Sequence, residues 1–141
     1  MKLVFPLNIF RSKDLPLNIS HFLDHFVMLI FAKAAFDSAV YFGITYAKII
    51  LYGTFGLILF GAAAPIASIL SERYSRRLLL IIFPLGVGIS SILAGISQNL
   101  MHLGLSLSLI GLFASIYHPV GIAMLMKNKS NLGFRLGLNG V

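Results

Sequence analysis

Ser68-Ile-Leu-Ser-Glu72-Arg73-Tyr-Ser75-Arg76-Arg77 is a short, arginine-rich connection between two long apolar segments. The segments on its two sides carry almost no charged residues, so the basic side chains gather in the connection itself. This pattern is typical of a tight cytoplasmic turn that joins two membrane helices. The stretch therefore indicates an integral membrane protein.

The overall composition leads to the same class. Of the 141 residues, 58% are hydrophobic and only 11% are charged, and the mean hydropathy is +0.94, whereas soluble domains have about 25% charged residues. The net charge of +7 does not indicate a nucleic-acid partner, because the basic residues cluster between apolar segments instead of following one face. The chain has no cysteine, which excludes disulfides, thiolate metal sites and cysteine nucleophiles. It carries no hydrolase, phosphate-loop or dinucleotide motif, so we expect neither an enzyme nor a cofactor.

Four apolar segments are each close to the roughly 20 residues that a helix needs to cross a bilayer. They cover residues 19–43, 49–70, 78–96 and 100–126. The predicted fold is an all-α integral membrane protein with four transmembrane helices. The first segment is a poor signal peptide, because it starts late and contains Asp24 and Asp37.

The basic residues predict the orientation of these helices. Nine Lys and Arg fall on one side, namely Lys2, Arg11, Lys13, Arg73, Arg76, Arg77, Lys127, Lys129 and Arg135. The connections on the opposite side carry only Lys48. By the positive-inside rule, both termini lie in the cytoplasm and the protein is a multi-pass protein of the inner (plasma) membrane. We expect a cytoplasmic segment over 1–18, the helices over 19–126, and a basic loop with the start of a fifth helix over 127–141.

The arginine-rich connection resembles the loop between helices two and three of the major facilitator superfamily, whose pattern is Gly-x-x-x-Asp-Arg-x-Gly-Arg-Arg/Lys. Arg73, Arg76 and Arg77 match this pattern, and Glu72 occupies its acidic position. Ser68 and Ser75 stand where the family has glycines. These loop residues are expected to hold the topology and to cap neighbouring helix ends.

Three further segments are similar to a bacterial branch of that superfamily. They are His21-Phe-Leu-Asp-His-Phe-Val-Met-Leu-Ile-Phe31, Gly111-Leu-Phe-Ala-Ser-Ile-Tyr-His-Pro-Val-Gly-Ile-Ala-Met-Leu125 and Leu136-Gly-Leu-Asn-Gly-Val141. The resemblance implies a fold of two six-helix bundles that moves a small solute by alternating access. This chain would then supply an N-terminal fragment of such a transporter. Its partners would be the bilayer, a small solute with or without protons, and the missing C-terminal part, without which we do not expect transport.

A second interpretation stays open. A self-contained four-helix membrane protein could act as an assembly partner or as an oligomeric exporter of the small multidrug type. The glutamate found in the first helix of those exporters has no counterpart here, where the acids of the first segment are Asp24 and Asp37. The sequence does not identify a substrate.

Polar residues inside the apolar segments are the candidate site residues. His21, Asp24 and His25 are spaced i, i+3 and i+4 and therefore share one helix face. They either bind a substrate or proton, or lie at head-group depth with Asp24 in the positive first turn of the helix. A metal site is the weakest interpretation, because the sequence supplies no outer contacts that would orient the ligands.

A second pair, Lys33 and Asp37, lies deeper in the same segment and points away from Asp24. Lys33 is about 18 Å beyond His21 along a helix, near the middle of the bilayer. The pair either couples substrate to protons or forms an internal ion pair that offsets its own burial cost.

In the fourth segment, His118 ends a stripe of small and polar residues formed by Gly104, Ser108, Gly111 and Ser115. Such stripes let membrane helices approach closely, so His118 is expected to face protein, as a substrate or proton contact or as a structural histidine. Pro119 predicts a kink nearby, while Pro65 and Pro84 predict bends without breaks. Other small residues are expected to serve helix packing, namely Gly56, Ala64, Ser68, Gly88, Ser91 and Gly95.

Overall fold

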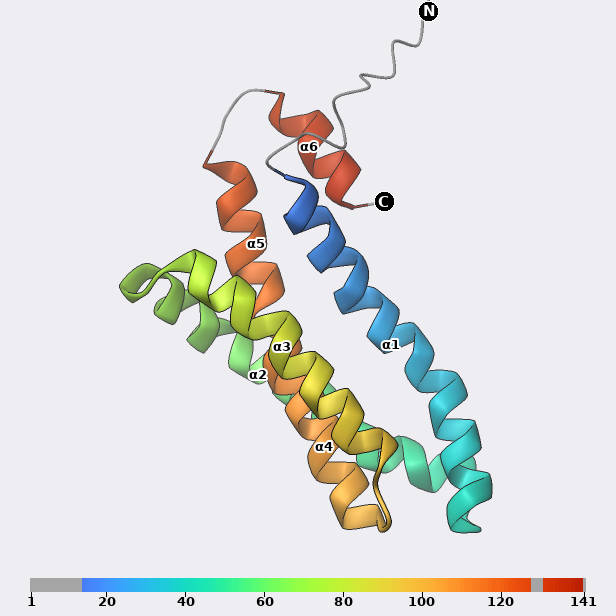
Figure 1. The fold of residues 1–141 in the computed structure, drawn as a ribbon. Helices are drawn as coiled ribbons and strands as arrows, with labels where there is room; N and C mark the ends of the chain where they lie inside the picture. The colour runs from blue at the N-terminus through green and yellow to red at the C-terminus, as the bar shows by residue number, and fades with distance from the viewer. Residues whose placement is uncertain (1–13, 128–130, 141) are drawn as a thin grey trace, which may run out of the picture.

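The computed structural model describes residues 14–127 and 131–140, and the regular structure in these residues is entirely α-helical (Figure 1). The helices are α1 (Leu15–Phe42), α2 (Tyr46–Arg73), α3 (Arg76–Gly95), α4 (Leu100–Ala114), α5 (Tyr117–Met126) and α6 (Leu132–Asn139). Four stretches are long and apolar enough to cross a membrane: α1, α2, α3, and the combined stretch Leu100–Met126. The predicted fold class is confirmed. Lys2, Arg11, Lys13 and Lys129, which contribute to the predicted orientation, lie outside the described residues.

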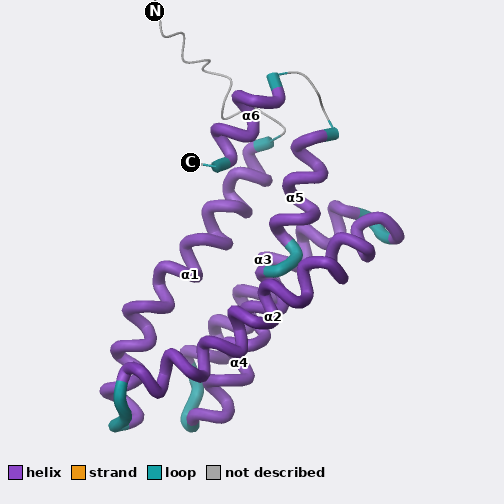
Figure 2. Tube along the Cα trace, turned by 180° about the vertical axis from the view of Figure 1, so that it is seen from behind, coloured by secondary structure: helices purple, strands orange, loops and turns teal. Residues whose placement is uncertain are grey.

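Short connections with specific end residues join the helices. Gly43 ends α1 in the left-handed conformation, with φ of +63°, and its N–H bonds the carbonyls of Ala39 and Val40. Only Tyr74 and Ser75 lie between α2 and α3, so the arginines of this connection lie at the last residue of α2 and in the first turn of α3. The Ser75 hydroxyl accepts the N–H of Leu78 at 3.5 Å. Successive spans therefore run in opposite directions (Figures 1 and 2).

Glycine brings α2 and α4 into backbone contact. A Cβ atom at Gly111 would lie 1.9 Å from the carbonyl oxygen of Gly56, and a Cβ at Gly56 would lie 2.5 Å from that of Leu107. Any side chain there would force the helices apart, as expected for small residues at a membrane helix interface. The packing role predicted for Gly88 and Gly95 is wrong, because both face open space.

In α3, the glycine that approaches α4 closely is Gly86, which lies on a different face of the helix from Gly88. A Cβ there would lie 2.2 Å from the ring of Phe113 in α4. The spacing of small residues in α3 was compatible with more than one face. The position of the bulky Phe113 on the facing helix decides which glycine is needed.

The fourth span is interrupted at Ser115 and Ile116, between α4 and α5. Pro119 has no N–H to donate to the carbonyl of Ser115 four residues earlier, which accounts for the break. Pro65 and Pro84 lie inside continuous helices, as the sequence predicted. After the interruption, α5 contacts α2, α3 and the first half of α1, where Tyr117 and His118 meet Leu17 and Asp24.

Helix α4 packs closely against both α2 and α3. Helix α1 meets α2 and α4 mainly toward its C-terminal end, and its N-terminal half lies beside α5 and α6 (Figures 1 and 2). One core lies where the end of α1 meets α2 and α4, around Ala35, Ala39, Ile49 and Leu103. A second core joins α3 to α4 and α5 around Phe83 and Tyr117. Many large apolar side chains on the outside are exposed, including Leu29, Val40 and Met101, as a lipid-facing surface requires.

Candidate functional site

A buried carboxylate lies between α1 and α5. Asp24 is 1% exposed, and its Oδ2 lies 3.2 Å from Nε2 of His118. Within the described part of the chain, neither Asp24 oxygen has a hydrogen-bond partner, although His118 lies at ion-pair distance. A buried carboxylate without hydrogen bonds is costly, so this position requires a functional or electrostatic reason.

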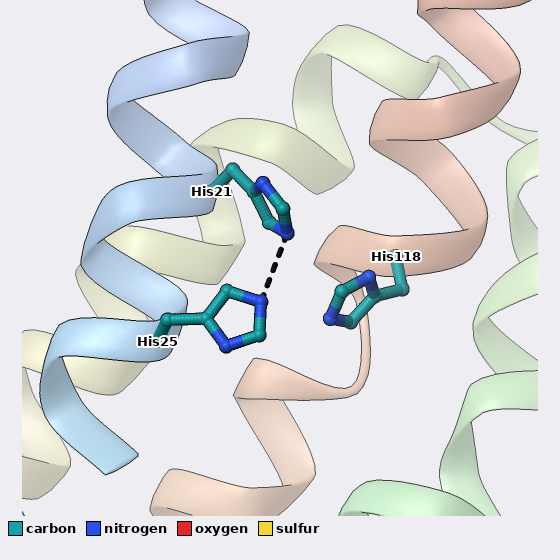
Figure 3. A group of neighbouring side chains, drawn as sticks. All are labelled: His21, His25 and His118. Atoms are coloured by element: carbon teal, nitrogen blue, oxygen red, sulfur yellow. Dashed lines mark hydrogen bonds between the residues drawn. The ribbon is translucent and has the colours of Figure 1, made fainter. Parts of the chain in front are cut away.

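Two more histidines complete a polar cluster, defined here as His21, Asp24, His25 and His118. Figure 3 shows its three histidines. Nε2 of His25 lies 2.9 Å from Nε2 of His21. The ring centroid of His118 is 5.3 Å from that of His21 and 5.6 Å from that of His25. The predicted shared face of α1 is thus turned toward the His118 of the fourth span.

The position of Asp24 along α1 differs from one of the two expectations. Because α1 begins at Leu15, Asp24 lies in about its third turn. The positive charge of a helix N-terminus acts within the first turn only, so it does not stabilise this carboxylate. The interpretation of Asp24 as an acid in the first turn of the helix is therefore wrong.

Helix α6 supplies a second layer around the cluster. The backbone carbonyl of Asn139 is hydrogen-bonded to Nδ1 of His21, and the Asn139 amide donates to Asn18 Oδ1 at 3.0 Å and to the Tyr117 hydroxyl at 2.9 Å. Tyr117 is fully buried, donates to the carbonyl of Leu17 at 2.9 Å, and stacks on the His21 ring at 5.2 Å. These contacts fix the orientation of His21.

An ion pair also holds α6 against the start of α1. The Arg135 guanidinium donates to the two Asp14 carboxylate oxygens, at 2.5 and 2.8 Å. This hydrogen bonding lowers the pKa of Asp14 from its ordinary value, although partial burial acts in the opposite direction. Planar two-point pairing of this kind is among the stronger charge-assisted contacts.

A cavity of about 900 Å³ lies between α1, α2, α3 and α4. Its wall is mostly apolar, and Asp37 and Gln98 are among the few polar residues that line it. Phe60 lines the cavity and also lies edge-on against His118, with ring centroids 5.9 Å apart. Phe60 therefore contacts both the polar cluster and the cavity.

Lys33 and Asp37 form an ion pair with each other and not with the cluster. The Lys33 amine donates to both Asp37 carboxylate oxygens, and the two side chains are 74% and 60% exposed. The predicted separation from Asp24 agrees with this arrangement. The pair belongs to the cavity wall through Asp37.

The loop residues lie apart from both the cluster and the cavity. Arg76 is half-buried, and its Nη1 donates to the carbonyl of Ala123 at 3.5 Å, in the last turn of α5. Glu72, Arg73 and Arg77 are exposed, and none of them forms an ion pair in the part of the chain that the structure describes. The loop residues were predicted to cap neighbouring helix ends, and in the structure Arg76 makes such a contact with the end of α5.

Sequence reasoning did not single out Tyr117, Asn18 or Asn139 as site residues. A usable signal existed, because each is a polar residue in an apolar stretch, and Tyr117 directly precedes His118. Only the docking of α6 shows that Asn139 reaches His21.

Comparison of this chain with protein-family models, with curated proteins and with solved structures finds no match. The site geometry and the sequence pattern are therefore the grounds on which a function is proposed.

Proposed function

We propose that this chain is the N-terminal part of a secondary active transporter of the major facilitator superfamily, which moves a small solute across the membrane by alternating access. The observation that carries the proposal is the buried Asp24 facing His118 across two candidate membrane spans. An ionisable residue at membrane depth costs about 2.5–3.5 kcal/mol on insertion scales. Such residues usually line ion or substrate pathways, which favours transport over a purely structural role.

The broken fourth span supports this proposal. Discontinuous helices near a binding site are common in transporters, where backbone groups freed from the helix line a cavity. Here the interruption at Ser115 and Ile116 lies directly before Tyr117 and His118. Among the described spans, the fourth is the one that is divided into two helices, and it contributes His118 to the polar cluster.

The cavity supports a small solute as the cargo. Its volume of about 900 Å³ falls in the range of about 300–1,000 Å³ that is typical of small-molecule sites. The apolar wall and the few polar groups are also typical of such sites. We place the solute in this cavity and the polar cluster at its end, with Phe60 between them.

We further infer that both termini face the cytoplasm and that the membrane is the inner (plasma) membrane. The arginines of the connection between α2 and α3, together with Lys127 and Arg135, support this orientation by the positive-inside rule. The contact from Arg76 to the end of α5 also supports this orientation, because the start of α3 and the end of α5 are both predicted to lie at the cytoplasmic side.

Uptake into liposomes tests the proposal. The 141-residue chain is reconstituted alone and, in parallel, extended by the coding sequence that follows Val141, and labelled sugars, organic acids and lipophilic cations are offered. The proposal predicts gradient-driven uptake of at least one class by the extended protein and none by the chain alone, because a transport path lies between two bundles. Robust uptake by the chain alone would favour an oligomeric small multidrug-type exporter. A coding sequence without further apolar spans would contradict the proposal.

A further inference from the structure

We propose that His21, His25 and His118 form a binding site for one Zn²⁺ ion, with Asp24 as the outer partner of His118. This inference does not depend on transport and goes beyond the function proposed above. Three imidazoles from two helices meet here, and one ligand nitrogen from each lies within 4.8 Å of the others. Figure 3 shows the three rings turned toward one another.

The spacing of the nitrogens fits zinc after small side-chain rotations. In a tetrahedral site, nitrogens at about 2.0–2.1 Å from zinc are roughly 3.4 Å apart. The two Nε2 atoms of His21 and His25 are already 2.9 Å apart. The upper limit of 4.8 Å exceeds the ideal separation by about 1.4 Å, which is the scale of a side-chain rotation.

The helix spacing itself favours this pairing. Two histidines at i and i+4 lie on one helix face, which is the arrangement by which helical zinc motifs present two ligands to one ion. His21 and His25 have this spacing in α1, and His118 comes from α5. The third ligand therefore ties the first span to the fourth.

The outer contacts of the imidazoles are those of metal ligands. A histidine that binds zinc usually donates its other ring N–H to a carbonyl or carboxylate, which fixes the tautomer and the ring orientation. His21 directs Nδ1 to the carbonyl of Asn139, which leaves Nε2 for a cation. His118 directs Nε2 toward Asp24, which leaves Nδ1. The sequence lacked any sign of such outer contacts. The structure supplies one hydrogen bond, from His21 to the Asn139 carbonyl, and one carboxylate at ion-pair distance, Asp24 beside His118.

The charge of the site also calls for a cation. Asp24 is fully buried and has no hydrogen bond in the described part of the chain. A divalent ion at the neighbouring imidazoles would compensate this carboxylate in a region of low dielectric constant. Imidazole ligands select zinc and other late transition metals over Mg²⁺ and Ca²⁺, which prefer oxygen.

Metal binding is measured on the chain purified in detergent with a histidine-free tag and stripped with a chelator. Calorimetric titration with Zn²⁺, the zinc retained after gel filtration, and the visible absorption of a Co²⁺ complex are the three readouts. We expect one Zn²⁺ per chain and a Co²⁺ spectrum typical of a tetrahedral ion with three histidine nitrogens and one oxygen ligand from solvent. Failure of the parental chain to retain zinc would overturn the proposal without bearing on transport.

Variants then assign the ligands. His21→Ala, His25→Ala and His118→Ala should each weaken Zn²⁺ binding by at least about 100-fold, and Asp24→Asn by about 10- to 100-fold, as is usual for an outer partner. His102→Ala is the matched control, because His102 is the remaining histidine of the chain, and it should stay within about twofold of the parent. If His118→Ala does not fold by circular dichroism, His118→Gln replaces it. Parental affinity in the His118 variant, or an equal loss in His102→Ala, would overturn the assignment.

Discussion

The carboxylate of Asp24 lies 3.2 Å from Nε2 of His118, so a buried acid of the first membrane span meets a histidine of the fourth. The two residues are far apart in the chain, and His118 lies in the first turn of α5, directly after the interruption between α4 and α5. Together with the hydrogen bond from Tyr117 to Leu17, this contact joins the N-terminal half of α1 to α5, whereas the C-terminal end of α1 packs on α2 and α4.

Cross-linking tests this contact directly, because the natural chain has no cysteine. The double variant Asp24→Cys/His118→Cys should react with a short thiol-specific cross-linker in membranes to give an internally linked chain of altered gel mobility. Lys33→Cys/His118→Cys is the control and should stay unlinked, since Lys33 is exposed and pairs with Asp37 instead. Equal linking of both pairs would show that α1 does not hold this orientation.

Gly111 should tolerate no side chain. In Gly111→Ala the new methyl group would meet the backbone oxygen of Gly56, and overpacking of this kind costs about 1–3 kcal/mol. Unfolding in mixed detergent micelles, followed by circular dichroism, should show that loss. Gly88→Ala is the matched control, because open space surrounds Gly88, and its stability should equal or slightly exceed that of the parent.

The contact between α1 and α6 should weaken in acid. Arg135 lowers the pKa of Asp14 in the folded chain, so the pair contributes stability above the ordinary aspartate pKa of about 3.9 and loses it as the pH falls through the lower folded value. The contribution is roughly 1 kcal/mol for a partly exposed pair. Spin labels on α6 and on the start of α1 should therefore keep their distance from neutral pH to about pH 5 and separate only below about pH 4.

The variant Asp14→Asn provides the reference for that experiment. It should show the wider, more variable label distance at neutral pH and no further change in acid, because the carboxylate that titrates is gone. An acid transition of unchanged size in Asp14→Asn would assign the effect to another group.

Much of the fold could be read from the sequence. The lengths of the apolar segments gave four spans, since hydrocarbon thickness sets the length of a membrane helix. Spacing placed His21, Asp24 and His25 on one face, because a helix has a fixed period. The glycines of α4 were assigned to packing correctly, as the contact of Gly111 with Gly56 shows.

The remaining features depend on how helices meet, which spacing alone does not determine. Gly86 rather than Gly88 contacts α4, because Phe113 lies opposite it. The short α6 folds back so that Asn139 reaches His21 and Arg135 reaches Asp14. Long-range contacts of this kind leave no periodic signal in either partner, so the second layer of the site emerged only from the structure.

Reporter fusions test the proposed orientation. Fusions before Ile19 and after Lys129 should report the cytoplasm, and fusions at 97–99 should report the outside, because the basic residues gather on one side. A cytoplasmic signal from 97–99 would contradict the orientation and the number of crossings.

Solute uptake by the extended transporter, with His118→Ala compared against His102→Ala, tests the central claim most directly. His118 lies in the polar cluster between α1 and α5, whereas His102 lies in the first turn of α4. The account predicts that His118→Ala lowers the uptake rate at least tenfold, which corresponds to about 1.4 kcal/mol, while His102→Ala keeps nearly the parental rate at equal abundance in the membrane. Equal rates in the two variants would contradict the assignment of the cluster as the functional site.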